Sequence, residues 1–130
     1  MNLHTESWKP LLYAVVDGEV DPESAELLMK LTTSRAAEKG ISKILIDGRL
    51  VTGNLSTAER EALGAKLADH VAELGTTPSI AVIGHPPAFT GQAASVASDR
   101  GVNIELFESI PEGLAFLRAK ITAEKPAIAA

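Results

Sequence analysis

The fold of this chain is decided by the stretch LLYAVVDGEVDPE at residues 11–23, in which an apolar run leads into the start of a helix. The run Leu11–Val16 has the length of a buried strand, and the Asp-Gly pair after it is a place where the chain can bend. Asp21 can then cap free helix amides, Pro22 needs no amide at the first helical position, and Glu23 suits the positive end of the helix dipole. The stretch therefore predicts a strand followed by a helix.

The same alternation occurs three more times along the 130 residues. The later apolar runs are Ile44–Ile46, Ile80–Ile83 and Ile104–Phe107, and the amphipathic stretches after them open near Ser56, Thr90 and Ser109. Repeated strand-then-helix units build a parallel sheet with helices packed on it. The sequence therefore predicts an α/β fold, a mainly parallel sheet of four or five strands with about four helices.

Two of the runs also indicate where their strands lie in the sheet. Lys43–Asp47 is apolar without alternation, as in a central strand that is covered on both faces, and Asp47-Gly48-Arg49 is expected to end it before a loop over residues 50–55. Asn103–Phe107 alternates apolar and polar residues, which is typical of an edge or half-exposed strand.

Each predicted helix has its own pattern of apolar residues and end signals. The first is expected to stop at Gly40. Its predicted buried face has three-to-four spacing and consists of Ala25, Leu28, Leu31 and Arg35, widened by Leu27. The second opens with the capping-box spacing of Ser56 and Glu59 and closes at Gly75. Its apolar side consists of Leu63, Leu67, Val71 and Leu74. The third, about residues 91–100, consists of small residues that allow close packing, and the last has one apolar stripe: Ile110, Leu114, Leu117 and Ile121.

Composition sets limits on the class of protein. The length predicts one domain, residues 1–121, followed by a frayed tail at 122–130 that has no pattern. A formal charge of −5 with scattered Lys and Arg argues against a nucleic-acid partner. The absence of cysteine excludes disulfides and thiol catalysis and is compatible with the cytoplasm. The N-terminus lacks the pattern of a signal peptide, and the longest apolar run is far too short to span a membrane.

Few residues suggest chemistry, and the sequence predicts neither an enzyme nor a cofactor. His4, His70 and His85 have no shared metal-ligand spacing, and His70 falls on the charged, solvated side of its helix. His85 follows a parallel strand, at the sheet edge where clefts of α/β proteins form. Asp47 and Arg49 are either a polar pair lining that cleft or, the favoured interpretation, a turn residue and an arginine that reaches solvent or a helix end.

No glycine-rich phosphate loop and no nucleophile elbow is present. The helix starts at Ser56 and Thr90 could hold an anion through free amides, a property shared by every helix start.

The order and spacing of these segments resemble a STAS domain, the family of the anti-sigma-factor antagonists. The similarity begins with the strand that ends in Gly18-Glu19-Val20-Asp21 and continues through residues 44–50 to the helix start at Ser56. Over residues 11–118 the chain resembles more closely the stand-alone SpoIIAA-like, or STAS-like, branch, which is related to the CRAL-TRIO lipid-binding domains. The resemblance implies an additional antiparallel strand from the N-terminal residues.

The resemblance implies two functions. A CRAL-TRIO-like protein would bind a small apolar or lipid-like ligand, with a membrane surface as a further contact, in a pocket for which the small third helix leaves room. Its contacts would come from strand ends and helix starts: Asp47, Arg49, His85, Thr90 and Gly91. The alternative is a regulatory switch that binds a protein partner, with Ser56 as the phosphosite. There Asn54 and Thr57 replace the aspartate and glycine of the family motif, and a helix cap is the favoured role of Ser56.

Overall fold

The computed structural model describes the backbone of residues 1–8 and 10–129, and the side chains of residues 1–8 and 10–119. Its elements follow in the order β1 (Asn2–Trp8), β2 (Leu11–Glu19), α1 (Pro22–Glu38), β3 (Lys43–Thr52), α2 (Thr57–Leu74), β4 (Ser79–Ile83), α3 (Gln92–Asp99), β5 (Asn103–Phe107) and α4 (Ile110–Ala129). The strands form one sheet in the order β1-β2-β3-β4-β5, in which β1 is antiparallel to β2 and the other neighbours are parallel. The predicted α/β fold and the extra N-terminal strand are confirmed.

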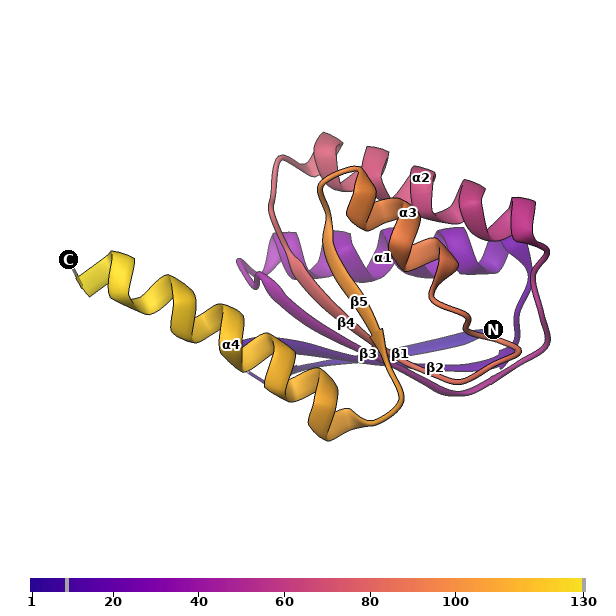
Figure 1. Cartoon of the computed structure of the whole chain (residues 1–130), viewed down its shortest axis with the longest axis horizontal. Helices are drawn as coiled ribbons and strands as arrows, with labels where there is room; N and C mark the ends of the chain where they lie inside the picture. Colours follow the sequence, from indigo (N-terminus) through magenta and orange to yellow (C-terminus); the bar gives the residue numbers. More distant parts are fainter. Residues whose placement is uncertain (9, 130) are drawn as a thin grey trace.

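The sheet lies between two layers of helices. Helices α1, α2 and α3 cover one face and α4 covers the other (Figure 1). Alternate residues of the central strands enter two different cores, because successive side chains of a strand point to opposite faces. Ile44 and Ile46 belong to the larger core under α1–α3, whereas Leu45 packs with Leu117 of α4. The predicted burial of Ile44–Ile46 on both faces and the edge position of Asn103–Phe107 are therefore confirmed.

Strand β3 is longer than predicted, and so is its neighbour β2. The expected strand end at Asp47-Gly48-Arg49 was wrong, because β3 continues to Thr52 beside β2, which itself runs past its predicted bend to Glu19. A shift of register between Val15 and Asp17 allows Asp17–Glu19 to pair with Leu50–Thr52. Pairing between two strands, rather than local sequence, therefore sets where both of them end.

Helices α1 and α2 begin and end at the predicted residues. The Asp21 carboxylate accepts a hydrogen bond from the Ser24 amide at 2.9 Å and caps α1. Gly40 follows the last turn of α1 with φ 68°, and Gly75 ends α2 in the left-handed conformation with φ 70°. Both glycines occupy backbone conformations that other residues rarely adopt.

The buried face of α1 differs from the prediction. Leu27 is 57% exposed and Leu31 also reaches solvent, while Thr32 and Thr33 are buried in their place. The threonine hydroxyls donate to the carbonyl oxygens one turn back, Thr32 at 2.7 Å and Thr33 at 2.8 Å. These bonds satisfy the hydroxyls inside the helix, so the two threonines are buried at little cost.

Helix α3 begins one residue later than Thr90 suggested. Its first residue is Gln92, and Gly91 precedes it at φ 81° without a side-chain cap. In α4, Leu117 is buried against the sheet as its stripe predicts. The predicted domain end at 121 and the frayed tail at 122–130 fall outside the residues whose side chains are described, and both stay predictions.

Candidate functional site

The start of α2 presents an exposed serine at the edge of the sheet where the parallel strands end. The Ser56 hydroxyl accepts from the Glu59 amide at 3.1 Å, and the Glu59 carboxylate accepts from the Ser56 amide at 2.8 Å. This is the predicted capping box, and it satisfies two amides that have no partner within the helix. Ser56 is therefore a helix cap and also solvent-exposed.

Arg60 ties this helix start to the loop that follows β4. Its guanidinium donates to the Pro87 carbonyl oxygen at 2.7 Å and to the side-chain oxygen of Asn54. Arg60 is not among the predicted site residues. Its position four residues after Ser56 was the available signal, because residues i and i+4 lie on the same side of a helix.

Phe89 closes the same loop against the sheet. Its ring lies so close to Gly48 and Gly84 that a Cβ atom on either glycine would overlap it. The Phe89 amide donates to the His85 carbonyl oxygen at 2.9 Å, which makes a turn of residues 85–89. His85 itself is exposed. Gly48, at the predicted end of its strand, and Gly84, directly after β4, were the sequence signal for this contact.

An apolar cavity of about 110 Å³ lies between the sheet and helices α1, α2 and α3. Its walls include Leu28, Ile46, Leu67, Val82 and Phe89. Of the predicted ligand contacts, Thr90 and Gly91 line it, whereas Asp47, Arg49 and His85 are not among its lining residues.

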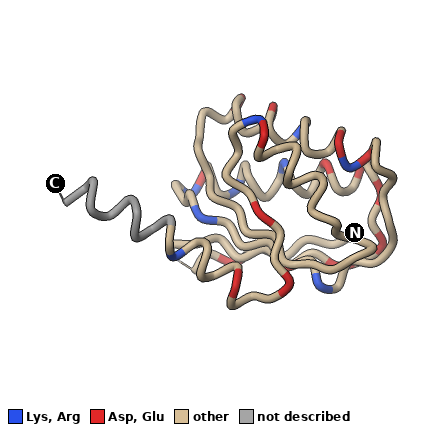
Figure 2. Tube along the Cα trace, viewed as in Figure 1, with Lys and Arg blue, Asp and Glu red and all other residues tan. Residues whose placement is uncertain are grey.

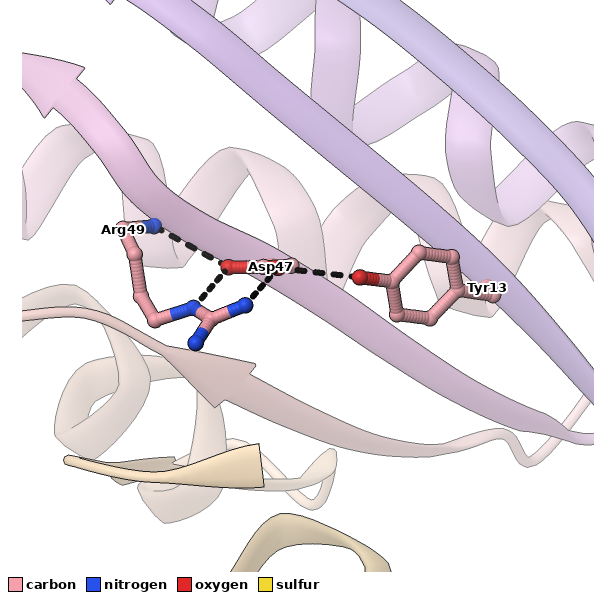
Figure 3. A network of polar contacts seen from close by, with 3 residues as sticks. All are labelled: Tyr13, Asp47 and Arg49. Carbon is pink, nitrogen blue, oxygen red and sulfur yellow. Dashed lines mark hydrogen bonds and ion pairs between the residues drawn. The ribbon is translucent and has the colours of Figure 1, made fainter.

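Asp47 and Arg49 form a pair on the other face of the sheet (Figure 3). The Arg49 guanidinium donates to both carboxylate oxygens of Asp47, at 2.9 and 2.8 Å, and the Tyr13 hydroxyl donates to the same carboxylate at 2.9 Å. Asp47 lies two residues after Leu45, so it shares the face that α4 covers. The favoured interpretation is wrong for Asp47, which lies within β3 rather than at a turn, and Arg49 is half-exposed yet bound to Asp47.

The network shifts the pKa values of its members. The bidentate Arg49 contact lowers the pKa of Asp47, against the opposing effect of burial at 5% exposure. Burial raises the pKa of Tyr13, and the hydrogen bond to Asp47 raises it further. Trp8 stacks on Tyr13 with ring centroids 4.2 Å apart and shields it from water. The Arg49 contact thus favours an ionised Asp47, whereas burial and the hydrogen bond to Asp47 favour a neutral Tyr13.

The remaining histidines, His4 and His70, neither line the cavity nor join the network of Asp47. His4 is exposed on β1, with its ring nitrogen 3.1 Å from the Glu6 carboxylate. His70 is half-buried rather than solvated as predicted, because its Nε2 lies 3.1 Å from the Ser34 hydroxyl of the neighbouring α1. Within the described residues no group of three or more His, Asp or Glu side chains could hold a metal ion.

Charged residues are spread along the described trace. Lys and Arg alternate with Asp and Glu over the helices and loops (Figure 2). Among the described helices, none is long and apolar enough to cross a bilayer.

A solved structure of similar architecture is known. No family model and no curated protein matches the chain. The crystal structure of an anti-sigma factor antagonist from Mycobacterium paratuberculosis is similar, with a TM-score of 0.61 and 20% sequence identity over 90% of this chain and 93% of that one. The anti-sigma factor antagonist SpoIIAA in its unphosphorylated form has a TM-score of 0.49 and 11% identity over 91% of this chain and 97% of that one, which does not establish a shared fold. The likeness to the mycobacterial protein confirms the predicted STAS-type architecture: the chain has the fold of an anti-sigma factor antagonist.

Proposed function

We propose that this chain is a SpoIIAA-like regulatory protein that binds an anti-sigma factor, and that phosphorylation of Ser56 switches the binding off. The observation that carries the proposal is the end-to-end likeness to an anti-sigma factor antagonist, which covers 90% of this chain and 93% of that protein. Such a protein acts by binding another protein and needs no cofactor. Its proposed place is the cytoplasm, where a sigma factor would be regulated.

This proposal reverses the order of the two functions that the sequence suggested. From the sequence, binding of a small apolar or lipid-like ligand was the first expectation, because the resembled family is related to lipid-binding domains. The solved structure most useful for comparison is instead a protein that acts on a protein partner. We therefore place the partner switch first.

Ser56 has the setting that a switch at this position requires. The side chain is exposed, and Thr57 and Ala58 beside it are exposed as well, so both a kinase and a partner can reach this turn. A phosphate would add nearly two negative charges to the start of α2. It would meet the Glu59 carboxylate, which now accepts from the Ser56 amide at 2.8 Å. Phosphorylation would thus expel Glu59 from the cap and reshape the contact surface.

Direct binding to purified anti-sigma factors from the same genome tests the proposal. We expect one of them to bind the wild type and Ser56→Ala with similar affinity. Ser56→Asp should weaken binding at least about tenfold, because an added charge facing an interface built for a neutral hydroxyl costs several kcal/mol. Isothermal titration calorimetry gives the affinities.

Ser109 provides the matched control on the other side of the sheet. It precedes α4 with the same spacing to an acidic residue, and its hydroxyl bonds Glu112 at 2.8 Å. Ser109→Asp should therefore leave binding unchanged. The proposal is wrong if no anti-sigma factor binds the wild type, or if Ser56→Asp and Ser109→Asp weaken binding equally.

A further inference from the structure

We propose that the cavity under α1, α2 and α3 is a binding site for a compact, uncharged apolar molecule of about the size of benzene. The inference rests on the cavity alone and does not depend on the partner proposed above. It narrows the small apolar or lipid-like ligand that the sequence suggested to a compact occupant of stated size.

The volume of the cavity decides the size of the occupant. At about 110 Å³ it is somewhat smaller than an engineered protein cavity of about 150 Å³ that binds benzene or xenon. A molecule of about six non-hydrogen atoms fits such a space. The acyl chain of a membrane lipid has many more carbons than this space can enclose.

The walls decide the chemistry of the occupant. A buried water needs two to four polar partners, and leucine, isoleucine, valine and phenylalanine side chains offer none. The polar lining residues are Arg60, Thr90 and Gln92. Arg60 is engaged with Pro87 and Asn54, and the Gln92 amide lies 3.4 Å from the Glu61 carboxylate. The walls therefore favour an apolar molecule over water or an ion.

Close packing of α3 on α2 explains why the space is present. A Cβ atom on Gly64 would overlap the Ala93 carbonyl oxygen, so α2 at Gly64 lies directly against the backbone of α3. Ala93 and Ala94 follow on the lining side of α3 and are too short to fill the gap above Val82. The backbones of α2 and α3 meet at Gly64, and the short alanine side chains of α3 leave the space beneath them unfilled.

Titration of the full-length protein with benzene, followed in two-dimensional amide NMR spectra, tests the inference. We expect saturable shifts at the amides of Gly64, Phe89 and Ala94, which line the cavity. Xenon should shift the same signals. Dodecanoate, the lipid-like probe, should not.

Two filling variants and one control make the test specific. Ala94→Leu and Ala88→Leu each add volume to a half-buried lining residue, one on α3 and one in the loop, and should weaken benzene binding at least tenfold. Ser95→Leu adds a leucine to the exposed side of the same helix and should bind as the wild type does. Signal dispersion in the same spectra reports whether each variant is folded. One folded filling variant is sufficient to test whether benzene binds in the cavity.

The outcomes that overturn the inference are distinct. Absence of saturable benzene and xenon shifts in the wild type would rule out the site. Equal binding by the wild type and a folded filling variant would place the ligand elsewhere. Dodecanoate shifts at the same amides would rule out a compact occupant. None of these results bears on binding of an anti-sigma factor, so the two proposals fail separately.

Discussion

The network of Tyr13, Asp47 and Arg49 joins three polar side chains on a largely apolar sheet face. Its carboxylate accepts four hydrogen bonds: two from the Arg49 side chain, one from the Arg49 amide at 3.2 Å and one from Tyr13. A buried carboxylate needs such partners, since an unpaired charge in this place would be costly. The network therefore explains how an aspartate can occupy a strand between two hydrophobic cores.

Replacing the carboxylate should change the ionisation of Tyr13. We expect Asp47→Asn to lower the pKa of Tyr13 from its raised value, because the negative charge beside the hydroxyl is lost. Burial is the larger cause of the shift and remains, so the pKa should stay above its ordinary value. Ultraviolet absorbance titration of this residue, the only tyrosine of the chain, measures the change. An unchanged pKa would mean that Asp47 does not contact Tyr13 in solution.

Ser56 has a structural role that can be measured without a partner. Ser56→Ala should lower the free energy of unfolding by about 1 kcal/mol, because the Glu59 amide loses its acceptor. Ser56→Asp should be nearly neutral, since aspartate caps as well and suits the helix dipole. Urea denaturation gives both values.

Ser109, the serine before α4, provides a comparison for the loss of stability in Ser56→Ala. At Ser109 the distance from the hydroxyl to the Glu112 amide is 3.4 Å, which is longer than at Ser56, so Ser109→Ala should cost less. A larger loss at Ser109 than at Ser56 would contradict the assignment of Ser56 as a cap.

At the scale of elements, α4 is the helix that closes the second face of the sheet. Its docking depends on Leu117, which is 1% exposed and packs with Leu45, Ala81 and Ile83. Without this contact the apolar side of β3 and β4 would face water.

Truncation at the centre of this contact should be costly. Leu117→Ala should reduce the free energy of unfolding by about 2–5 kcal/mol, the range for buried leucines that leave a cavity. Leu27→Ala is the matched control, because Leu27 is 57% exposed on α1 and should change stability by no more than about 0.5 kcal/mol. Equal losses in urea denaturation would show that α4 does not dock as described.

At the scale of the whole molecule, an ion-pair cluster joins the two long helices above the sheet. The Glu26 carboxylate of α1 bonds Lys30 at 2.9 Å and Lys66 of α2 at 2.8 Å. The hydrogen bonds from these two lysines lower the pKa of Glu26 from 4.5 to about 2. The pair to Lys66 therefore links α1 to α2 as long as Glu26 is ionised.

The sign of the pH dependence follows from this lowered pKa. The folded state binds a proton at Glu26 less readily than the unfolded chain, so the contribution is fully present above pH 4.5 and is lost as the pH falls toward 2. Glu26→Gln should accordingly unfold with a weaker pH dependence in this window than the wild type. Urea denaturation between pH 5 and about 2 measures it. The difference should shrink in high salt, which screens exposed ion pairs, and identical profiles would contradict the prediction.

Local chemistry made several features predictable from the sequence. The caps at Asp21 and Ser56 and the stop at Gly75 depend on atoms within a few residues of each position. The strand Ser79–Ile83 coincides with its own run of apolar residues. The alternation of Asn103–Phe107 is that of a strand at the edge of the sheet. Each of these features is encoded where it occurs, so the sequence by itself determined the order of elements and the class of fold.

Contacts between distant segments decided the remainder. The end of β3 depends on β2, and the burial of Thr32 in place of Leu31 depends on how α1 rotates over the sheet. Asp47 and Thr90 were both expected near strand ends, yet Asp47 lies within β3 and the sheet separates the two, because alternate residues point to opposite faces. The cavity is a space left between side chains of the sheet and of the three helices on one of its faces, which no local pattern specifies. The sequence determined the elements through local interactions, and the tertiary structure alone decided which side chains meet.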